Sequence, residues 1–470
     1  MTDRELRRQL TSAFSAARTR LPSAGPLGAL RHDLDELRRD YQLSLPRVVL
    51  VGRSGAGKTT LANALVGSDL FATGPFAATR VVTRVRDAAG PDLTEASQLL
   101  SRLDLIDTPD LQDPATTALL REGGADALVP LFIRGNPAAS DEDALRDFQE
   151  IGRAAEIGVP LNCVGVLPLD SFMASDIESA KAEAATVIAG IMGNDAASRL
   201  LYDLRPVAIR AAAAARAMGA HDVADLSALV AAATRSGRAG LAALLDLTHD
   251  GGDFTDPDDD KLPGGPAIQA SRRSDLWRLL GGYGLQLAFG LLADGADAAA
   301  LRQGLRDGSG ITAFAGLLTD HFAQRADLIK AHAVIGRAEA LVRQARDAPD
   351  AGLTGWDYAT LNDVAGFFRG QASVAWDTRT VISDCRSGRL SLDNGDTADA
   401  LRILGEPGQS ARERLGLPAT APDSDLAGRA IDRKNHWARL DRFPFDGDTR
   451  RACRTVLRAC EVLVSQTGLG

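Results

Sequence analysis

The segment Gly52-Arg53-Ser54-Gly55-Ala56-Gly57-Lys58-Thr59 constrains the fold of this 470-residue chain more than any other. Gly52 and Gly57, with four residues between them, are followed by a lysine and a hydroxyl residue, which is the pattern of a phosphate-binding loop, or P-loop. In such a loop the backbone amides point inward around phosphate oxygens, and the N-terminus of the next helix adds partial positive charge. The pattern therefore requires a strand, the loop and a helix in that order.

The residues on either side of the P-loop meet this requirement. Residues 47–52 form a short apolar run that ends in glycine, as in a buried parallel strand. Residues 59–67 predict a helix that ends at Gly67. Alternating strand and helix signals over residues 45–217 predict an α/β P-loop G domain with a doubly wound, mostly parallel sheet. The further strand candidates are residues 80–86, 103–107, 127–133, 162–168 and 206–209.

The rest of the chain has the apolar periodicity of helices. Residues 1–44 predict N-terminal helices that join a bundle, and residues 218–470 predict an elongated all-α helical bundle resembling a neck or trunk. Two segments rich in glycine, proline and acidic residues, near 250–268 and 405–425, are expected to be exposed flexible loops. The expected architecture is a G domain joined to a bundle built from N-terminal and C-terminal helices.

Composition excludes several classes of function. The formal net charge of -9 and the pI near 5.3 argue against a protein that binds nucleic acid through a broad basic face. Four scattered cysteines give no disulfide framework, and the charged N-terminus has no apolar core of a signal peptide. We expect a cytoplasmic protein, with peripheral contact to the inner face of the cell membrane as a further expectation.

Magnesium and phosphate chemistry can be assigned to particular side chains. Lys58 is expected to reach the β- and γ-phosphates, and Thr59 to give its hydroxyl to Mg²⁺. Asp107 follows an apolar run at a predicted strand end, where a carboxylate organises the shell of the metal ion. Arg53 is either an internal cation on the phosphates or a solvated loop arginine.

Three segments resemble those of dynamin-like GTPases. Residues 106–110 (Ile-Asp-Thr-Pro-Asp) are similar to the Asp-Thr-Pro-Gly motif, and residues 58–67 resemble the helix that follows the family's P-loop. Residues 79–83 (Thr-Arg-Val-Val-Thr) resemble switch I, which implies that Thr79 contacts the γ-phosphate and Mg²⁺. Segments 162–167, 322–330 and 448–454 extend the resemblance to actinobacterial dynamin-like GTPases of the isoniazid-inducible type.

The chain departs from the family pattern at two positions. Asp170 stands where the family's guanine-reading aspartate stands, but Pro168 replaces the lysine whose stem covers the base. Asp110 replaces the glycine whose amide contacts the γ-phosphate, which brings a side chain and a negative charge to that place. Ser54 and Gly55 occupy the middle of the P-loop without the glutamine used by dynamins.

These observations leave three functional hypotheses. The first is a dynamin-like GTPase that dimerises through its G domains and couples GTP hydrolysis to rearrangement of the bundle at a membrane. The second is a poorly hydrolysing nucleotide-binding subunit that works with a related dynamin-like protein, and the third is a soluble P-loop regulatory ATPase. The expected ligands are GTP or GDP with Mg²⁺; the expected nucleotide contacts are Gly52, Arg53, Ser54, Gly55, Ala56, Gly57, Lys58, Thr59, Thr60, Asp110 and Asp170, and the expected metal ligands are Thr59, Thr79 and Asp107.

The apolar, glycine-containing segment 281–292 has two interpretations. It is the only segment for which we can suggest membrane contact, and a helix buried in the bundle is the alternative.

Overall fold

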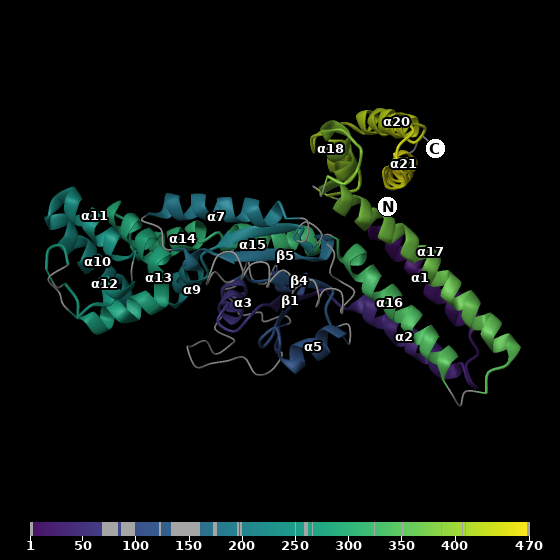
Figure 1. Ribbon diagram of the computed structural model, residues 1–470, viewed down its shortest axis with the longest axis horizontal. Coiled ribbons are helices and arrows are strands. Elements are labelled where there is room, and N and C mark those ends of the chain that lie inside the picture. The colour runs from purple at the N-terminus through teal and green to yellow at the C-terminus, as the bar shows by residue number, and fades with distance from the viewer. Residues whose placement is uncertain are drawn as a thin grey trace.

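The protein is elongated, with an α/β domain in the middle and helices at both ends (Figure 1). The computed structural model describes residues 3–67, 83–85, 99–121, 124–132, 160–172, 176–194, 197, 200–249, 251–257, 262–265, 267–323, 325–348, 352–386, 388–406, 408 and 410–467.

The described strands of the middle domain form a four-stranded sheet and a two-stranded sheet that isolated bridges join into one layer. Strand β1 (Arg47–Val51) pairs in parallel with β3 (Asp104–Asp107) and β4 (Ala127–Pro130), and β2 (Thr83–Val85) pairs antiparallel with β3. Strand β5 (Val164–Pro168) pairs in parallel with β6 (Asp203–Val207), and isolated parallel bridges join the β4 region to the β5 region. The resulting order is β2-β3-β1-β4-β5-β6.

The sheet is buried on both faces because its central strands are mainly apolar, with charged residues only at the ends of β1 and β3. Every residue of β1, β3, β4 and β5 is buried, as expected for parallel strands covered by helices on two sides. Val48 and Leu50 of β1 belong to a core that continues into the N-terminal helices, whereas Val49 and Val51 belong to a second core on the other face. The helices of this domain are α3 (Lys58–Val66), α5 (Pro114–Arg121), α7 (Ile177–Met192) and α9 (Ile209–Ala217).

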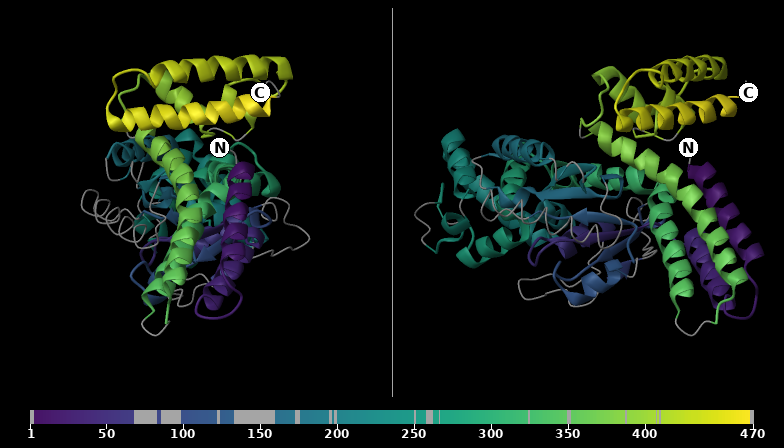
Figure 2. Two further views of the ribbon diagram at one scale, coloured as in Figure 1. Left: turned by 90° about the vertical axis from the view of Figure 1, so that its right-hand side faces the viewer. Right: turned by 45° about the vertical axis from the view of Figure 1, so that its right-hand side comes forward.

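A bundle at one end is formed by helices from distant parts of the chain. Helices α1 (Asp3–Arg20) and α2 (Gly28–Leu43) pack against α16 (Ala326–Asp347) and α17 (Gly355–Arg386), side by side in Figures 1 and 2. The rings of Phe14 and Phe368 meet edge to face at 5.0 Å inside this bundle. The predicted fold class, a P-loop α/β domain plus a bundle of N-terminal and C-terminal helices, is confirmed.

The other helices fall into two groups by their contacts. Helices α10 (Ala220–Arg235), α11 (Gly237–Leu247), α12 (Gly251–Thr255), α13 (Ala270–Ala293) and α14 (Ala298–Gly308) form a unit that contacts the α/β domain mainly through α9, and α15 (Ile311–Leu318) contacts α3 and β6. Helices α18 (Asn394–Ile403), α19 (Ala411–Leu415), α20 (Asp423–Leu440) and α21 (Gly447–Gln466) form a terminal unit on α17. Residues 218–470 are thus mainly helical and divide among three regions, and the predicted domain bounds stay a prediction.

Some details of the sequence prediction need correction. Strand β6 begins at Asp203, three residues before the predicted 206–209 segment, because its exposed polar residues hide the strand pattern. The two expected loops contain the short helices α12, with a buried Phe254, and α19, with a buried Leu415. Segment 281–292 lies within α13 and buries Phe289 fully, which agrees with the buried-helix alternative. Within the described residues, no helix is both long enough and apolar enough to cross a membrane.

A buried polar network joins the sheet to the bundle. The backbone amide and guanidinium of Arg47, at the start of β1, donate to the carboxylate of Asp126 at 2.8–3.0 Å. The side chain of Asn162 donates to the carbonyls of Asp126 (2.6 Å) and Ile329 of α16 (3.2 Å). Lys330, also on α16, donates to the carbonyls of Tyr41 and Ser44 at the end of α2 (2.5 and 2.7 Å). Helices α2 and α16 are therefore fixed to the end of the sheet at which the central strand β1 begins.

We expect Asp126→Asn to destabilise the protein strongly. The Arg47 side chain is 9% exposed and that of Asp126 is 0% exposed, so the substitution leaves a buried guanidinium with the partly exposed Asp40 carboxylate, 3.5 Å away, as its remaining salt-bridge partner. A loss of about 3–5 kcal/mol is the usual result of removing one partner of a buried pair. The measurement is the midpoint of unfolding in urea, with Glu178→Gln as the control because Glu178 forms an exposed pair with Lys181. A shift no larger than that of the control would contradict this role of Asp126.

Candidate nucleotide-binding site

The P-loop connects β1 to α3 in a conformation that needs glycine at two positions of the motif. Gly57 has a φ of 88° and precedes α3, and a Cβ there would lie 3.3 Å from the Ile209 side chain. A Cβ on Gly52 would lie 3.1 Å from the carbonyl oxygen of Leu131. Only a residue without a side chain combines this backbone with such close packing. The loop therefore stays open for the approach of a phosphate group to its backbone amides.

Lys58 is positioned by the first residues of the same loop. Its ammonium donates to the carbonyl oxygens of Gly52 (2.8 Å) and Arg53 (3.1 Å). Burial lowers the pKa of Lys58, and the negative charges of Asp107 and Asp110 oppose this change. The structure thus holds a partly desolvated cation against the start of the loop, where an anionic ligand would offset the desolvation cost.

Thr59, in the first turn of α3, meets Asp107 at the end of β3. The parallel register pairs Leu50 with Asp107, so the end of β3 lies beside the P-loop. The Thr59 hydroxyl donates to Oδ2 of Asp107 at 2.8 Å, and Asp107 is fully buried. A hydroxyl and a carboxylate are oxygen ligands of the kind that Mg²⁺ prefers. This pair fits the metal ion that the P-loop implies.

Asp110 contacts the P-loop directly. Its Oδ2 accepts a hydrogen bond from the backbone amide of Ser54 (2.5 Å), and its Oδ1 accepts one from that of Gln112 (3.0 Å). The next residue, Leu111, donates its amide to the carbonyl oxygen of Gly52 at 3.2 Å. The segment after β3 therefore packs along the first half of the loop, with a carboxylate on one of the loop amides.

Asp170 lies beside the start of α9. It follows β5 in a short 3-10 turn (Leu169–Ser171), and its Oδ2 accepts from the backbone amide of Arg210 at 3.1 Å. Ile209, the residue before Arg210, is the one that packs against Gly57 of the P-loop. Helix α9 thus connects the two ends of the candidate site.

The second oxygen of Asp170, Oδ1, is buried without a hydrogen-bond partner among the described residues. Gly281, with a φ of 65° inside α13, covers this place, and a Cβ on it would lie 3.7 Å from Oδ1. Burial raises the pKa of Asp170 to about 6, while the amide and the positive charge of Arg210 oppose the rise. An acceptor in this condition is suited to N–H donors of a ligand.

The remaining candidate residues are placed as follows. Arg53, Ser54 and Gly55 are exposed, Thr60 is half-buried and Ala56 is buried. Thr79 lies outside the described residues. The sequence analysis missed Arg210 and Gly281, although the pair of glycines at 281–282 inside an apolar helix was a signal of irregular backbone.

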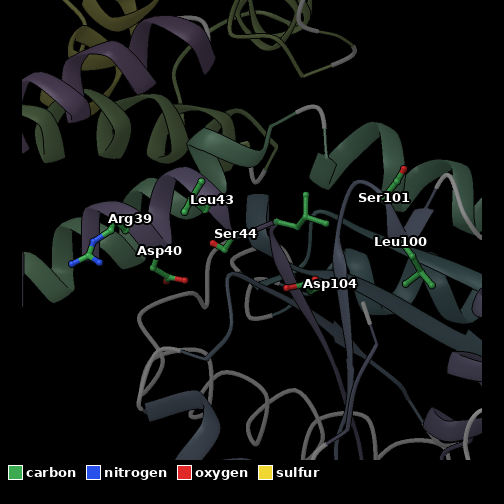
Figure 3. Close-up of a pocket in the computed structure, with 8 residues that line it drawn as sticks. Arg39, Asp40, Leu43, Ser44, Leu100, Ser101 and Asp104 are labelled. Atoms are coloured by element: carbon green, nitrogen blue, oxygen red, sulfur yellow. The ribbon is translucent and has the colours of Figure 1, made fainter. Parts of the chain in front are cut away.

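A cavity of about 680 Å³ lies away from the P-loop (Figure 3). Asp104 at the start of β3 and Leu45 just before β1 line it, together with the end of α2. These are the N-terminal ends of the parallel strands, whereas ligands of open α/β sheets bind beyond the carboxyl ends. The remaining lining residues are Arg39, Asp40, Leu43, Ser44, Leu100 and Ser101.

The sheet, the P-loop and the Thr59–Asp107 pair define a P-loop nucleotide-binding protein, and comparison with known proteins shows which family it resembles. Residues 48–118 match the model of the dynamin family. The chain is 27% identical over 462 residues to the isoniazid-induced protein IniC from two strains of Mycobacterium tuberculosis, covering 89% of this chain and 90% of the relative. The chain is therefore similar to the dynamin superfamily, and the predicted resemblance to the isoniazid-inducible type is confirmed.

Among solved structures, the crystal structure of a dimerization-deficient mutant of Toc33 from Arabidopsis thaliana is also similar to this chain. The identity is 17%, the TM-score is 0.26, and the match covers 40% of this chain and 80% of that chain.

Asp107→Asn tests the metal site. We expect nucleotide affinity in the presence of Mg²⁺ to fall about 10–100-fold, because the substitution removes the charge that would hold the ion beside Thr59. In EDTA the variant and the unaltered protein should bind equally. Isothermal titration calorimetry measures both, and Asp113→Asn is the matched control, since the Asp113 side chain bonds the amide of Ala115 at the start of α5. Equal loss with and without Mg²⁺ would contradict a metal-binding role.

Proposed function

We propose that this chain is a dynamin-like GTPase that binds GTP with Mg²⁺ and couples nucleotide binding and hydrolysis to movement of its helical bundle. The observation that carries the proposal is the Thr59–Asp107 hydrogen bond beside a P-loop whose lysine is held by Gly52 and Arg53. This arrangement supplies a cation for phosphate and two oxygen ligands for a divalent ion. When bound, Mg²⁺ would neutralise charge on the phosphates.

The proposed roles follow from chemistry and family resemblance. The backbone of Gly52–Thr60 surrounds the phosphates, and Thr59, Asp107 and Thr79 hold the metal ion. Lys58 and Thr79 act on the transferred phosphoryl group, and Arg53, which is exposed at the loop, adds a further positive charge there.

Asp170 is proposed to read the guanine base. Its Oδ1, which has no partner in the part of the chain that the structure describes, and its Oδ2, bonded to the amide of Arg210, provide the acceptors that guanine N–H donors need. Pro168, buried at the end of β5, replaces the lysine stem that would otherwise cover the base. Guanine recognition in this chain therefore depends on Asp170 more than it does in relatives that keep the lysine.

The junction between sheet and bundle supports coupling of the site to the bundle. Strand β1 has Arg47 of the buried polar network at one end and leads into the P-loop at the other. A shift of this strand would act on α2 and α16 through Asp126, Asn162 and Lys330. In the proposed cycle, dimerisation through the G domains, or pairing with a related dynamin-like protein, drives this shift at a membrane surface.

A specific observation favours a second candidate function. Asp110 already occupies the amide of Ser54 with a negatively charged group, and Pro168 weakens the base site. Both features suit a nucleotide-binding partner subunit with little turnover. A regulatory ATPase is the third alternative. A preference for ATP over GTP would distinguish it from the other two.

Turnover by the purified protein tests the proposed function. We expect GTP hydrolysis to exceed ATP hydrolysis, and Lys58→Ala to lower the GTP rate about 100-fold or more, because the lysine stabilises developing phosphate charge. Lys181→Ala is the matched control, since Lys181 is an exposed residue of α7 that pairs with Glu178. Equal rates in the unaltered protein and Lys58→Ala would exclude catalysis, and GTP binding without turnover would support the partner subunit.

The same preparations, centrifuged with anionic lipid vesicles, test the membrane part of the proposal. Binding is expected to increase with GTP relative to the nucleotide-free protein. Protein that stays in the supernatant in both conditions would remove the membrane from the proposed function.

The pH dependence of GDP binding tests Asp170. The raised pKa of about 6 means that lowering the pH through this value protonates the carboxylate and removes its acceptor. GDP affinity should therefore fall about tenfold between about pH 7 and about pH 5, whereas ADP affinity should change little, because adenine has no N1–H donor. Asp170→Asn should bind GDP weakly without this dependence on pH. The same pH profile in the variant would show that another group is responsible.

A further inference from the structure

The carboxylate of Asp110 occupies one particular end of the P-loop. Lysine of a P-loop reaches the β- and γ-phosphates, and here the Lys58 ammonium rests on the carbonyl oxygens of Gly52 and Arg53. The amide held by Asp110 belongs to Ser54, the next residue of the loop. The inner phosphates belong at the other end, at the N-terminus of α3, which begins at Lys58. Asp110 therefore stands at the end of the loop where a γ-phosphate would be bound.

The position of Asp110 is fixed by its own segment. Its Oδ1 accepts from the amide of Gln112 (3.0 Å), and its carbonyl oxygen accepts from that of Asp113 (2.9 Å). The Leu111 amide bonds Gly52 at 3.2 Å, and the Asp113 side chain bonds Ala115 at the start of α5. These bonds tie the turn to both the P-loop and α5, and the carboxylate leaves Ser54 only by also giving up Gln112 or by a movement of the turn.

A bound carboxylate and a γ-phosphate compete at this place. Both are anions that seek the same amide and the same Lys58 charge, and like charges within a few ångströms repel even near a protein surface. The outermost phosphate of a nucleoside diphosphate ends before this position. We propose that Asp110 makes the site selective for a nucleoside diphosphate over the triphosphate, by holding the Ser54 amide in place of a γ-phosphate.

This inference rests on the proposed function, since it concerns the same nucleotide site. It adds that the preferred ligand of the unaltered chain is a nucleoside diphosphate. The diphosphate binds with the Asp110 turn in place. The triphosphate binds only when the Asp110 carboxylate leaves the Ser54 amide. Two substitutions separate charge from shape: Asp110→Asn keeps an acceptor for the Ser54 amide without the charge, and Asp110→Gly removes both.

The test compares dissociation constants for GDP and the slowly hydrolysed analogue GTPγS, each with Mg²⁺, by isothermal titration calorimetry of the full chain. We expect the unaltered protein to bind GDP at least about tenfold more tightly than GTPγS, a difference well within reach of one repelled charge. Asp110→Asn should reduce the ratio of GDP affinity to GTPγS affinity. Asp110→Gly should bring this ratio to about one or below one. Asp113→Asn, which removes a charge from the same turn without touching the P-loop, should leave the ratio unchanged.

The outcomes distinguish this inference from the proposed function. If the unaltered protein binds GTPγS as tightly as GDP, or if Asp110→Gly keeps the preference for GDP, the inference is wrong while nucleotide binding stands. ADP and ATPγS are measured in parallel, and a preference for the diphosphate in that pair alone supports the inference with a different base. If none of the four nucleotides binds, both the proposed function and the inference are overturned.

Discussion

The parallel pairing of β1 with β3 is the constraint on which the candidate site depends. Its register sets Leu50 beside Asp107, and the hydrogen bond between Thr59 and Asp107 follows from that alignment. A shift by one residue would turn Asp107 to the other face of the sheet and leave a buried carboxylate without the threonine. The register is held by apolar burial on both faces, since Val48 and Leu50 enter one core and Val49 and Val51 enter the other. Packing of the sheet therefore positions groups that are themselves polar.

How much of this was predictable depends on how local each contact is. The P-loop and its lysine were predicted because the glycine spacing alone dictates the backbone. Asp107 was predicted because a carboxylate at the end of a neighbouring parallel strand lies next to the P-loop. Asp110 was expected to repel a γ-phosphate, but its bond to Ser54 depends on how the turn after β3 packs, which residue types do not specify. The same holds for Asp170, whose contacts with Arg210 and Gly281 join three segments that are far apart in the sequence.

The helices show the same limit on a larger scale. Apolar periodicity identifies a face that must be buried, but it does not identify the partner. Helices α10–α14 and α16–α17 have similar compositions, yet the first group contacts the α/β domain mainly through α9, whereas the second packs with α1 and α2. What separates them in the structure is polar: Asn162 and Lys330 tie the start of α16 to Asp126 and to the end of α2. Such bonds are specific only once the fold has formed.

Asp110 and Asp170, at the two ends of the candidate site, differ in how far their hydrogen bonds are satisfied, so the two ends respond differently to a nucleotide. Asp110 has amide donors for both of its oxygens, whereas Oδ1 of Asp170 has no partner among the described residues. A ligand shifts a conformational equilibrium only by its differential affinity for the two states. Because Gly281 covers Oδ1 in the conformation described here, a base that bonds Oδ1 favours a conformation in which this cover has opened. A γ-phosphate must instead break the contact of Asp110 with Ser54, so it favours a conformation in which the carboxylate has left the P-loop. Base and γ-phosphate would then act on different ends of one site, and the length of the phosphate chain would decide whether the Asp110 end changes.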